Sequence, residues 1–175
     1  MKVFDNLVSK LFQNKIENYL LNNNFPWFYQ KESLQSSMPK KYKIQTKDTF
    51  NEFQMSHKFI DKGKINSQHI GIIVELLKEL KMETSQILRC KANLKFKTTT
   101  NKKHNIFHID NPNSHKVLIY YVNDSDGDTY LKLNNSIKTV KPKKGRILTF
   151  DGKIMHAANH PKKNDKRLII NFNML

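Results

Sequence analysis

His108 and Asp110 lie two residues apart and carry side chains that bind metals. On an extended chain, side chains at this spacing project to the same side, so one metal ion can contact both. His156 follows 48 residues later, after a predicted turn and short strand. Two neutral imidazoles and one carboxylate form the facial triad that suits iron(II) and leaves coordination positions open. We therefore predict a non-haem iron site at His108, Asp110 and His156.

Arginine is scarce in this chain, which makes each arginine informative. The sequence holds 28 Lys and 20 Asn but only three Arg, at positions 89, 146 and 167. Such a chain is expected to keep Arg where a planar fork of donors is needed. Arg167 lies 11 residues after His156, where it could pair with the far carboxylate of 2-oxoglutarate while the other end of that acid binds the metal. The order H-x-D, His, Arg therefore predicts a co-substrate site beside the metal.

Each of these residues also has a purely structural interpretation. His108 and Asp110 could form a hydrogen-bonded turn pair, His156 could be a structural histidine, and Arg167 could be a surface cation at the start of a strand. Histidines without any partner pattern, which we expect at the surface, are His104, His115 and His160.

The first half of the chain predicts helices that would support such a site. Apolar residues at helical spacing predict an amphipathic helix over about residues 3–21 and a second one over 67–81, with Ser67 as its N-cap. The aromatic cluster at 25–29 contains a proline and is expected to pack in the core, with a pocket wall as the alternative. Residues 30–50 are polar and predict a loop with a short element.

The second half predicts strands. Residues 88–97 alternate strictly between apolar and polar, which indicates a half-buried strand whose polar face meets solvent or a wet cavity. Further strands are predicted at 117–122, 129–133, 137–140, 146–150, 154–157 and 168–172. Helices followed by many short strands predict an α+β fold, a double-stranded β-helix (jelly roll, cupin-like) with N-terminal helices packed on one sheet. We expect a single domain over residues 1–175, with 1–86 a mainly helical support region and 87–175 the jelly-roll core.

Residues 108–123, HIDNPNSHKVLIYYVN, resemble the metal-binding segment of prolyl 4-hydroxylase-like 2-oxoglutarate dioxygenases. The resemblance covers about residues 87–175 and continues through DGDTY at 126–130, VKPKKGRILTF at 140–150, MHAA at 155–158 and KRLIINF at 166–172. The first half is similar to short phage and marine-bacterial members. Two departures bear on the prolyl chemistry: the family's Gly-Gly-Glu-Thr turn is altered at 126–129, and residues 98–103 lack the Tyr and Gly pattern usual before H-x-D.

The resemblance implies further roles and a reaction. Tyr121 would donate its hydroxyl to the same end of 2-oxoglutarate as Arg167, although an aromatic side chain in an apolar stretch can equally be core. Asn93 would be a further pocket contact. The implied cofactor is iron(II), with 2-oxoglutarate and dioxygen as co-substrates. Whether ascorbate is also required is left open. The implied reaction releases succinate and CO2 and hydroxylates a substrate, with a prolyl or other residue of a protein favoured.

The net charge of +16 leaves a second partner class open. A basic chain can bind nucleic acid by releasing counterions, but scattered lysines with abundant Asn are also what an AT-rich genome imposes on a tolerant surface. Repair demethylases with this metal site carry an Arg-x-Asn-x-Thr-x-Arg tail, which is missing after Arg167. The alternatives are an oxygenase acting on nucleic acid or a small molecule, and a catalytically silent jelly-roll binding or structural module.

The remaining bulk features predict location. The N-terminus does not resemble a signal peptide, no apolar stretch has the length of a membrane span, and Cys90 has no second cysteine to pair with. We expect a cytoplasmic protein, or one in the host cytoplasm if a phage encodes it, with no membrane partner. The sequence leaves the oligomeric state open.

Overall fold

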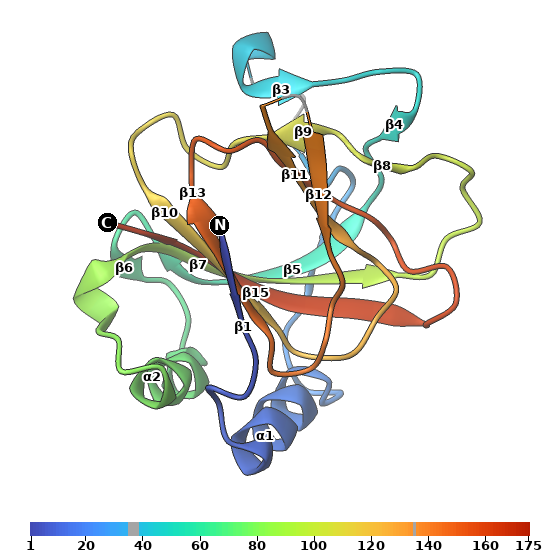
Figure 1. The fold of residues 1–175 in the computed structure, drawn as a ribbon. Helices are drawn as coiled ribbons and strands as arrows, with labels where there is room; N and C mark the ends of the chain where they lie inside the picture. The colour runs from blue at the N-terminus through green and yellow to red at the C-terminus, as the bar shows by residue number, and fades with distance from the viewer. Residues whose placement is uncertain (35–38, 135) are drawn as a thin grey trace.

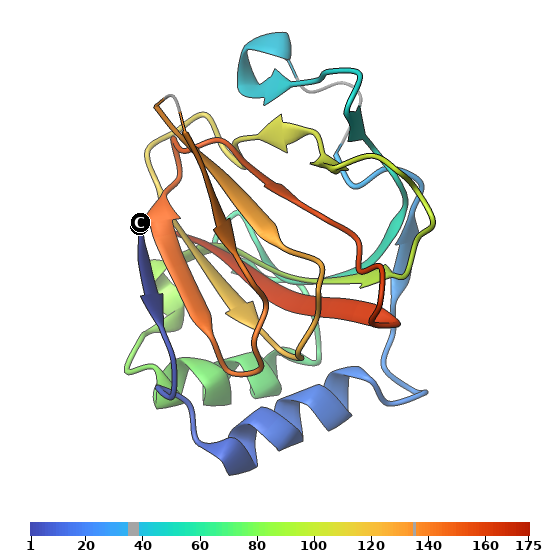
Figure 2. The same ribbon diagram turned by 45° about the vertical axis from the view of Figure 1, so that its right-hand side comes forward.

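The computed structural model describes residues 1–34, 39–134 and 136–175, and its strands form two facing sheets. Both helices lie against the larger sheet on the side away from the smaller one (Figures 1 and 2). The larger sheet has the order β1 (Lys2–Phe4), β13 (Ile147–Asp151), β10 (Lys116–Tyr121), β15 (Lys166–Met174), β7 (Ile87–Phe96), β5 (Gln54–Asp61), β2 (Phe28–Gln30), with β6 (Lys64–Ile65) also paired to β5.

The smaller sheet carries part of the predicted site. Its order is β12 (Ser136–Val140), β11 (Thr129–Leu133), β14 (His156–Ala158), β9 (Phe107–His108), β3 (Lys43–Ile44). A parallel pair, β4 (Thr49–Phe50) and β8 (His104–Asn105), lies beside it, and two 3-10 turns span Lys40–Tyr42 and Thr84–Gln86. This arrangement confirms the predicted α+β double-stranded β-helix, with the helices on one sheet.

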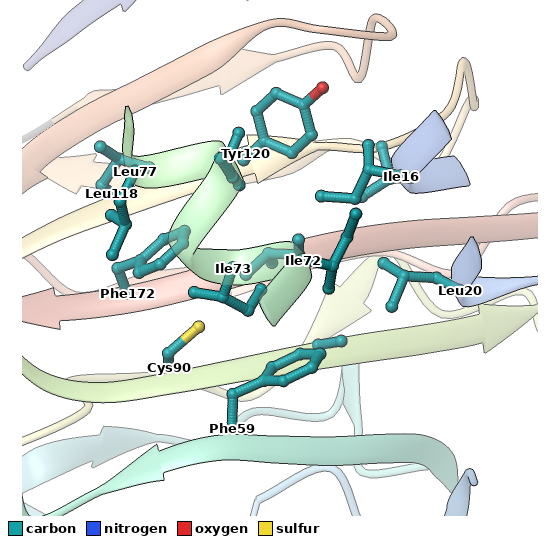
Figure 3. Close-up of a cluster of buried hydrophobic side chains, with 14 of the residues drawn as sticks. Ile16, Leu20, Phe59, Ile72, Ile73, Leu77, Cys90, Leu118, Tyr120 and Phe172 are labelled. Carbon is teal, nitrogen blue, oxygen red and sulfur yellow. The ribbon is translucent and has the colours of Figure 1, made fainter. Parts of the chain in front are cut away.

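The main hydrophobic core lies between the larger sheet and the helices α1 (Lys10–Leu20) and α2 (Ile70–Glu79). Figure 3 shows Leu20 of α1, Ile73 of α2 and Phe59 of β5 meeting in this layer. A second, smaller cluster fills the space between the two sheets. Each long strand of the larger sheet therefore has one face toward the helices and one toward the smaller sheet.

The strand alternation predicted at 88–97 is confirmed by β7. Cys90, Ala92 and Leu94 are buried in the helix-side core, while the residues between them point toward the smaller sheet. The sequence left solvent and a wet cavity open for that polar face, and the structure shows a cavity. The strand β15 behaves in the same way, with Leu168 and Ile170 on the helix side.

The N-terminal half differs from its prediction. The first helix begins at Lys10 because the Ser9 side chain accepts a hydrogen bond from the Phe12 amide, and residues 2–4 instead pair with β13 as β1. The second helix begins at Ile70 after a turn in which the Ser67 carbonyl accepts from Ile70.

The expectation of a mainly helical support region before residue 87 is wrong in one respect. Strands β1, β2 and β5 of this region extend the larger sheet, and β5 pairs along β7. The predicted loop at 30–50 holds β3 and β4, and its residues 35–38 lie outside the described part. Within the described residues, neither helix has the length and apolar character needed to cross a membrane.

Candidate metal and co-substrate site

The three residues predicted to bind metal come together in the structure. His108 on β9 and His156 on β14 are directly paired across the antiparallel strands of the smaller sheet, and their rings lie 4.6 Å apart. Asp110 follows β9, with Oδ1 3.7 Å from His108 Nε2 and Oδ2 3.9 Å from His156 Nε2. One ligand atom from each residue lies within 4.8 Å of the other two, so these side chains could hold a single metal ion.

The hydrogen bonds of the two imidazoles fix which nitrogen faces the site. His108 Nδ1 is 3.0 Å from the Ile106 carbonyl, and His156 Nδ1 is 3.4 Å from the Ile154 carbonyl. Because a carbonyl can only accept, both Nδ1 atoms carry the proton and both Nε2 lone pairs face Asp110. Burial, together with the charge of His156, lowers the pKa of His108 to about 4, and burial also lowers the pKa of His156. Both rings are therefore neutral at neutral pH, which is the form of imidazole that can bind a metal ion.

The larger sheet holds the Asp110 carboxylate. Arg89 Nη2 lies 2.9 Å from Oδ1, and the amide nitrogens of Asn171 and Asn173 each donate to Oδ2 at 2.9 Å. Burial acts to raise the pKa of Asp110, but Arg89, with His156 and His108, outweighs it and holds this pKa well below its usual range. The carboxylate is therefore ionised and oriented before any metal binds.

A cavity of about 750 Å³ opens between the sheets and joins the triad to Arg167. Arg167 on β15 is 1% exposed, and it donates from Nε to the Gly127 carbonyl at 2.6 Å and from Nη2 to Thr129 Oγ1 at 2.8 Å. The cavity is lined by His108, Asp110, His156 and Thr129 as well as by Arg167. A buried guanidinium at one end and a metal-binding triad at the other fit the two ends of a small dicarboxylic acid.

Of the other two predicted co-substrate residues, Asn93 lines the cavity and Tyr121 does not. Asn93 on β7 lines it, and its Oδ1 is buried without a hydrogen-bond partner. Tyr121 on β10 is fully buried in the cluster between the sheets. Its hydroxyl donates to Thr129 Oγ1 at 2.8 Å, and its ring lies 5.8 Å from the Arg167 guanidinium. Tyr121 thus contacts the Arg167 end of the site through Thr129.

Several site residues were not singled out from the sequence. Asn171 and Asn173 contact Asp110, while Lys91 and Lys95 of β7 line the cavity on the same face as Asn93. The alternation in β7 already placed these lysines on a polar face, and the scarcity of Arg marked Arg89. Contacts between strands could not be read from either signal, because they depend on the register of β7 against β15.

The expectation of surface positions is wrong for two of the three unpaired histidines. His115 and His160 are buried, and only His104 keeps an intermediate exposure. His160 Nδ1 donates to the Phe96 carbonyl, and its Nε2 lies 3.3 Å from Lys95 Nζ.

The aromatic cluster at 25–29, which was expected to pack in the core, does so only in part. Phe25 is in the core, while Phe28 is 61% exposed.

The donor set fits an iron(II) ion. Two imidazole nitrogens and one carboxylate oxygen lie within 4.8 Å of one another, and these are the donor types of the facial triad of non-haem iron sites. The Nδ1–H groups of both imidazoles donate to backbone carbonyls, which is the supporting hydrogen bond that metal-binding histidines usually make.

No protein-family model and no curated protein matches the sequence. Solved structures do match the fold. An oxidoreductase of the 2OG-Fe(II) oxygenase family from Burkholderia pseudomallei superposes with a TM-score of 0.64 at 11% identity, covering 94% of this chain and 78% of that one.

Two further solved structures agree. A prolyl hydroxylase from Trichoplax adhaerens, in complex with a hypoxia inducible factor peptide fragment, gives a TM-score of 0.65 at 13% identity over 99% of this chain and 82% of that one. The non-heme alpha ketoglutarate dependent epimerase SnoN from nogalamycin biosynthesis gives 0.64 at 9% identity, with 99% and 76% covered. The chain therefore has the fold of the 2OG-Fe(II) oxygenases, as its resemblance to the prolyl 4-hydroxylase-like dioxygenases implied.

Proposed function

We propose that this chain is an iron(II)- and 2-oxoglutarate-dependent dioxygenase that hydroxylates its substrate. The observation that carries the proposal is the placement of the triad and of buried Arg167 in one cavity between the sheets. His108 and Asp110 lie at least 46 residues before His156 and Arg167, and a binding module without turnover would have no need to bring these two pairs together. The fold shared with solved oxygenases supports the same assignment.

The chain's own residues would bind and orient the reactants. His108 and His156, through Nε2, and Asp110, through a carboxylate oxygen, would hold the ion. Arg167 would pair with the far carboxylate of 2-oxoglutarate. The Thr129 hydroxyl accepts hydrogen bonds from the Arg167 guanidinium and from the Tyr121 hydroxyl, and so holds both in place.

Apolar residues on the cavity wall would limit access of water between these two ends. They include Ile119, Ala157 and Ile169. When bound, iron(II) supplies the activation of dioxygen that couples decarboxylation of 2-oxoglutarate, to succinate and CO2, with hydroxylation of a substrate C–H bond.

A residue of a protein is the substrate class we favour, with proline as the first to test. Support comes from the prolyl hydroxylase neighbour, which is solved with a peptide. The altered turn at 126–129 keeps Gly127, and a Cβ there would lie 2.7 Å from Arg167 Cδ. The glycine is therefore needed for the close approach of the Arg167 side chain.

The proposal is tested by adding iron(II) and then 2-oxoglutarate to the metal-free protein under anaerobic conditions. A weak visible charge-transfer band is expected on addition of the acid, followed by succinate formation when air is admitted. His156→Ala should abolish both signals, whereas His104→Ala, which removes an imidazole outside the triad, should keep them.

Absence of both the band and succinate in the folded wild-type protein would contradict the proposal and favour a silent jelly-roll module. A salt-dependent DNA and RNA binding assay tests the nucleic-acid alternative, and no binding at moderate salt would exclude it.

A further inference from the structure

The polar face of β7 forms a row of side chains along the cavity. Arg89, Lys91, Asn93 and Lys95 alternate with the core residues of the strand, and the last three line the cavity. We infer that Lys91 is the counter-charge of a subsite for an anionic group carried by the substrate. This inference rests on the proposed function and narrows its substrate class.

Lys91 differs from its cationic neighbours because it has no partner among the residues that the structure describes. Arg89 pairs with Asp110, and Lys58, which faces Lys91 across the β5–β7 pair, forms an ion pair with Asp61 at 2.8 Å. Lys95 Nζ contacts His160. Among the described residues Lys91 makes no hydrogen bond or ion pair, although it is only partly exposed and borders the cavity.

The charges around the cavity leave an excess of positive charge. Its lining includes the cations Lys31, Lys58, Lys91 and Arg167, but its only acidic residues in the described part are Glu32 and Asp110. Lys95 also lines the cavity, but burial lowers the pKa of its amine well below the usual range, so it is not counted as a cation. A bound metal ion would add two positive charges and 2-oxoglutarate would add two negative ones, so the excess remains after both have bound.

An enclosed ammonium without a counter-ion is costly. Burial lowers the pKa of Lys91 to about 8, with a contribution from Arg89, yet the amine is still mostly protonated at neutral pH. A ligand that supplies the missing negative charge would remove this cost, and an acidic group on the substrate is the simplest source.

Two amide oxygens without a hydrogen-bond donor flank Lys91, and they indicate a second chemical group that the ligand should carry. Asn93 lies two positions further along β7, and Asn171 faces Lys91 directly across the β7–β15 pair. The Oδ1 atoms of both amides are buried without partners. Buried acceptors are satisfied by N–H or O–H donors, so the ligand should carry a donor next to its acid group. An acidic residue in a peptide, with its backbone N–H, has this combination.

The co-substrate could in principle use the same amine, so the experiment fills the co-substrate site first. Protein loaded anaerobically with iron(II) and saturating 2-oxoglutarate, as judged by the visible band, is titrated in a calorimeter with acetyl-Asp-Pro-amide or acetyl-Asn-Pro-amide. These probes differ by one negative charge. Inorganic phosphate is titrated separately to detect a subsite that takes free anions.

Wild-type protein should bind the Asp peptide, or phosphate, at least about tenfold more tightly than the neutral Asn peptide. Lys91→Met, which keeps the length of the side chain and removes its charge, should remove this preference. Lys91→Arg should largely keep it. Lys138→Met on exposed β12 is the matched control and should behave as wild type.

Phosphate binding without preference for the Asp peptide would assign the subsite to a free anion, and the reverse would assign it to an acidic residue. The inference is overturned if neither acidic probe binds better than the neutral peptide up to millimolar concentration, or if the preference survives in Lys91→Met. Protein that shows no band with 2-oxoglutarate contradicts the proposed function instead, so the two failures are distinguishable.

Discussion

The contact between Arg89 and Asp110 gives the sharpest prediction, because its energy should depend on whether metal is bound. The side chain of Asp110 is 7% exposed and that of Arg89 is 26% exposed. Removing one partner of a buried ion pair costs about 3–5 kcal/mol. Asn171 and Asn173 still donate to the carboxylate, and Arg89 is partly open to water, so for Arg89→Met we expect a loss of about 2–3 kcal/mol in the metal-free protein.

A divalent ion at the triad supplies the positive charge that the variant lacks. The difference between Arg89→Met and wild type should therefore shrink to below about 1 kcal/mol when metal is bound. For a chain of this size the metal-free loss corresponds to a fall in Tm of about 5–10 °C. Thermal unfolding in EDTA and in excess Mn²⁺ measures both values without redox chemistry.

Arg146→Met is the matched control for this prediction. Arg146 also pairs with one carboxylate, donating from Nε and Nη2 to Asp5 at 2.8 and 2.9 Å, but it does not line the cavity. The free energy of unfolding that Arg146→Met loses should be the same with and without Mn²⁺. Should Arg89→Met gain no more stability from the metal than wild type does, Arg89 does not act by balancing the charge of Asp110, and the reasoning is refuted.

Three other changes have defined outcomes. In Gly127→Ala, the new Cβ would lie 2.7 Å from Arg167 Cδ and 2.9 Å from a backbone oxygen, so the guanidinium must shift and the Kd for 2-oxoglutarate should rise by about tenfold or more, measured by calorimetry. An unchanged Kd would argue that Arg167 does not bind the acid. Burial, with the charge of Lys95, lowers the pKa of His160 from 6.5 to about 4, so the folded protein binds fewer protons than the unfolded chain between these values. Stability should therefore fall by about 2–3 kcal/mol as the pH drops from 6.5 to 4, and urea unfolding of His160→Gln should show a shallower fall. Hydrogen bonding to Arg146 lowers the pKa of Asp5 from 3.8 to about 2, so this pair stabilises the protein above pH 4 and is lost as the pH falls toward 2. Asp5→Asn should cost about 1 kcal/mol at pH 7, after allowance for solvent screening, and only a small part of that at pH 2, which urea unfolding at the two pH values measures.

The sequence predicted the fold best where an element is apolar on one face or on both. The strict alternation at 88–97 and the apolar stretch at 117–122 correspond closely to β7 and β10. The strand β5 went unpredicted because Gln54, Ser56 and Lys58, on the face opposite the helices, are polar and give no apolar stretch. The first helix was extended too far because β1 continues its apolar pattern, while the true start depends on a single side-chain cap at Ser9.

The site was predictable to the extent that it depends on residue type and spacing. The chain has only seven histidines, and the order His-x-Asp, His, Arg along the sequence is informative, so the convergence of the triad could be predicted. The support of Asp110 by Arg89, Asn171 and Asn173 could not, because it requires β7 and β15 to be aligned so that Arg89 faces Asn173. An asparagine in a chain with 20 of them gives no signal by itself.

Asp110 belongs to the chain that follows β9 of the smaller sheet, yet three residues of the larger sheet hold its carboxylate. This single side chain thus links the smaller sheet to the larger one. A metal ion bound by the triad would strengthen this link, because it would connect His108 of β9 and His156 of β14 to the same carboxylate. Amide hydrogen exchange in these two short strands should consequently slow on metal binding, while exchange in α1 and α2, behind the larger sheet, stays unchanged.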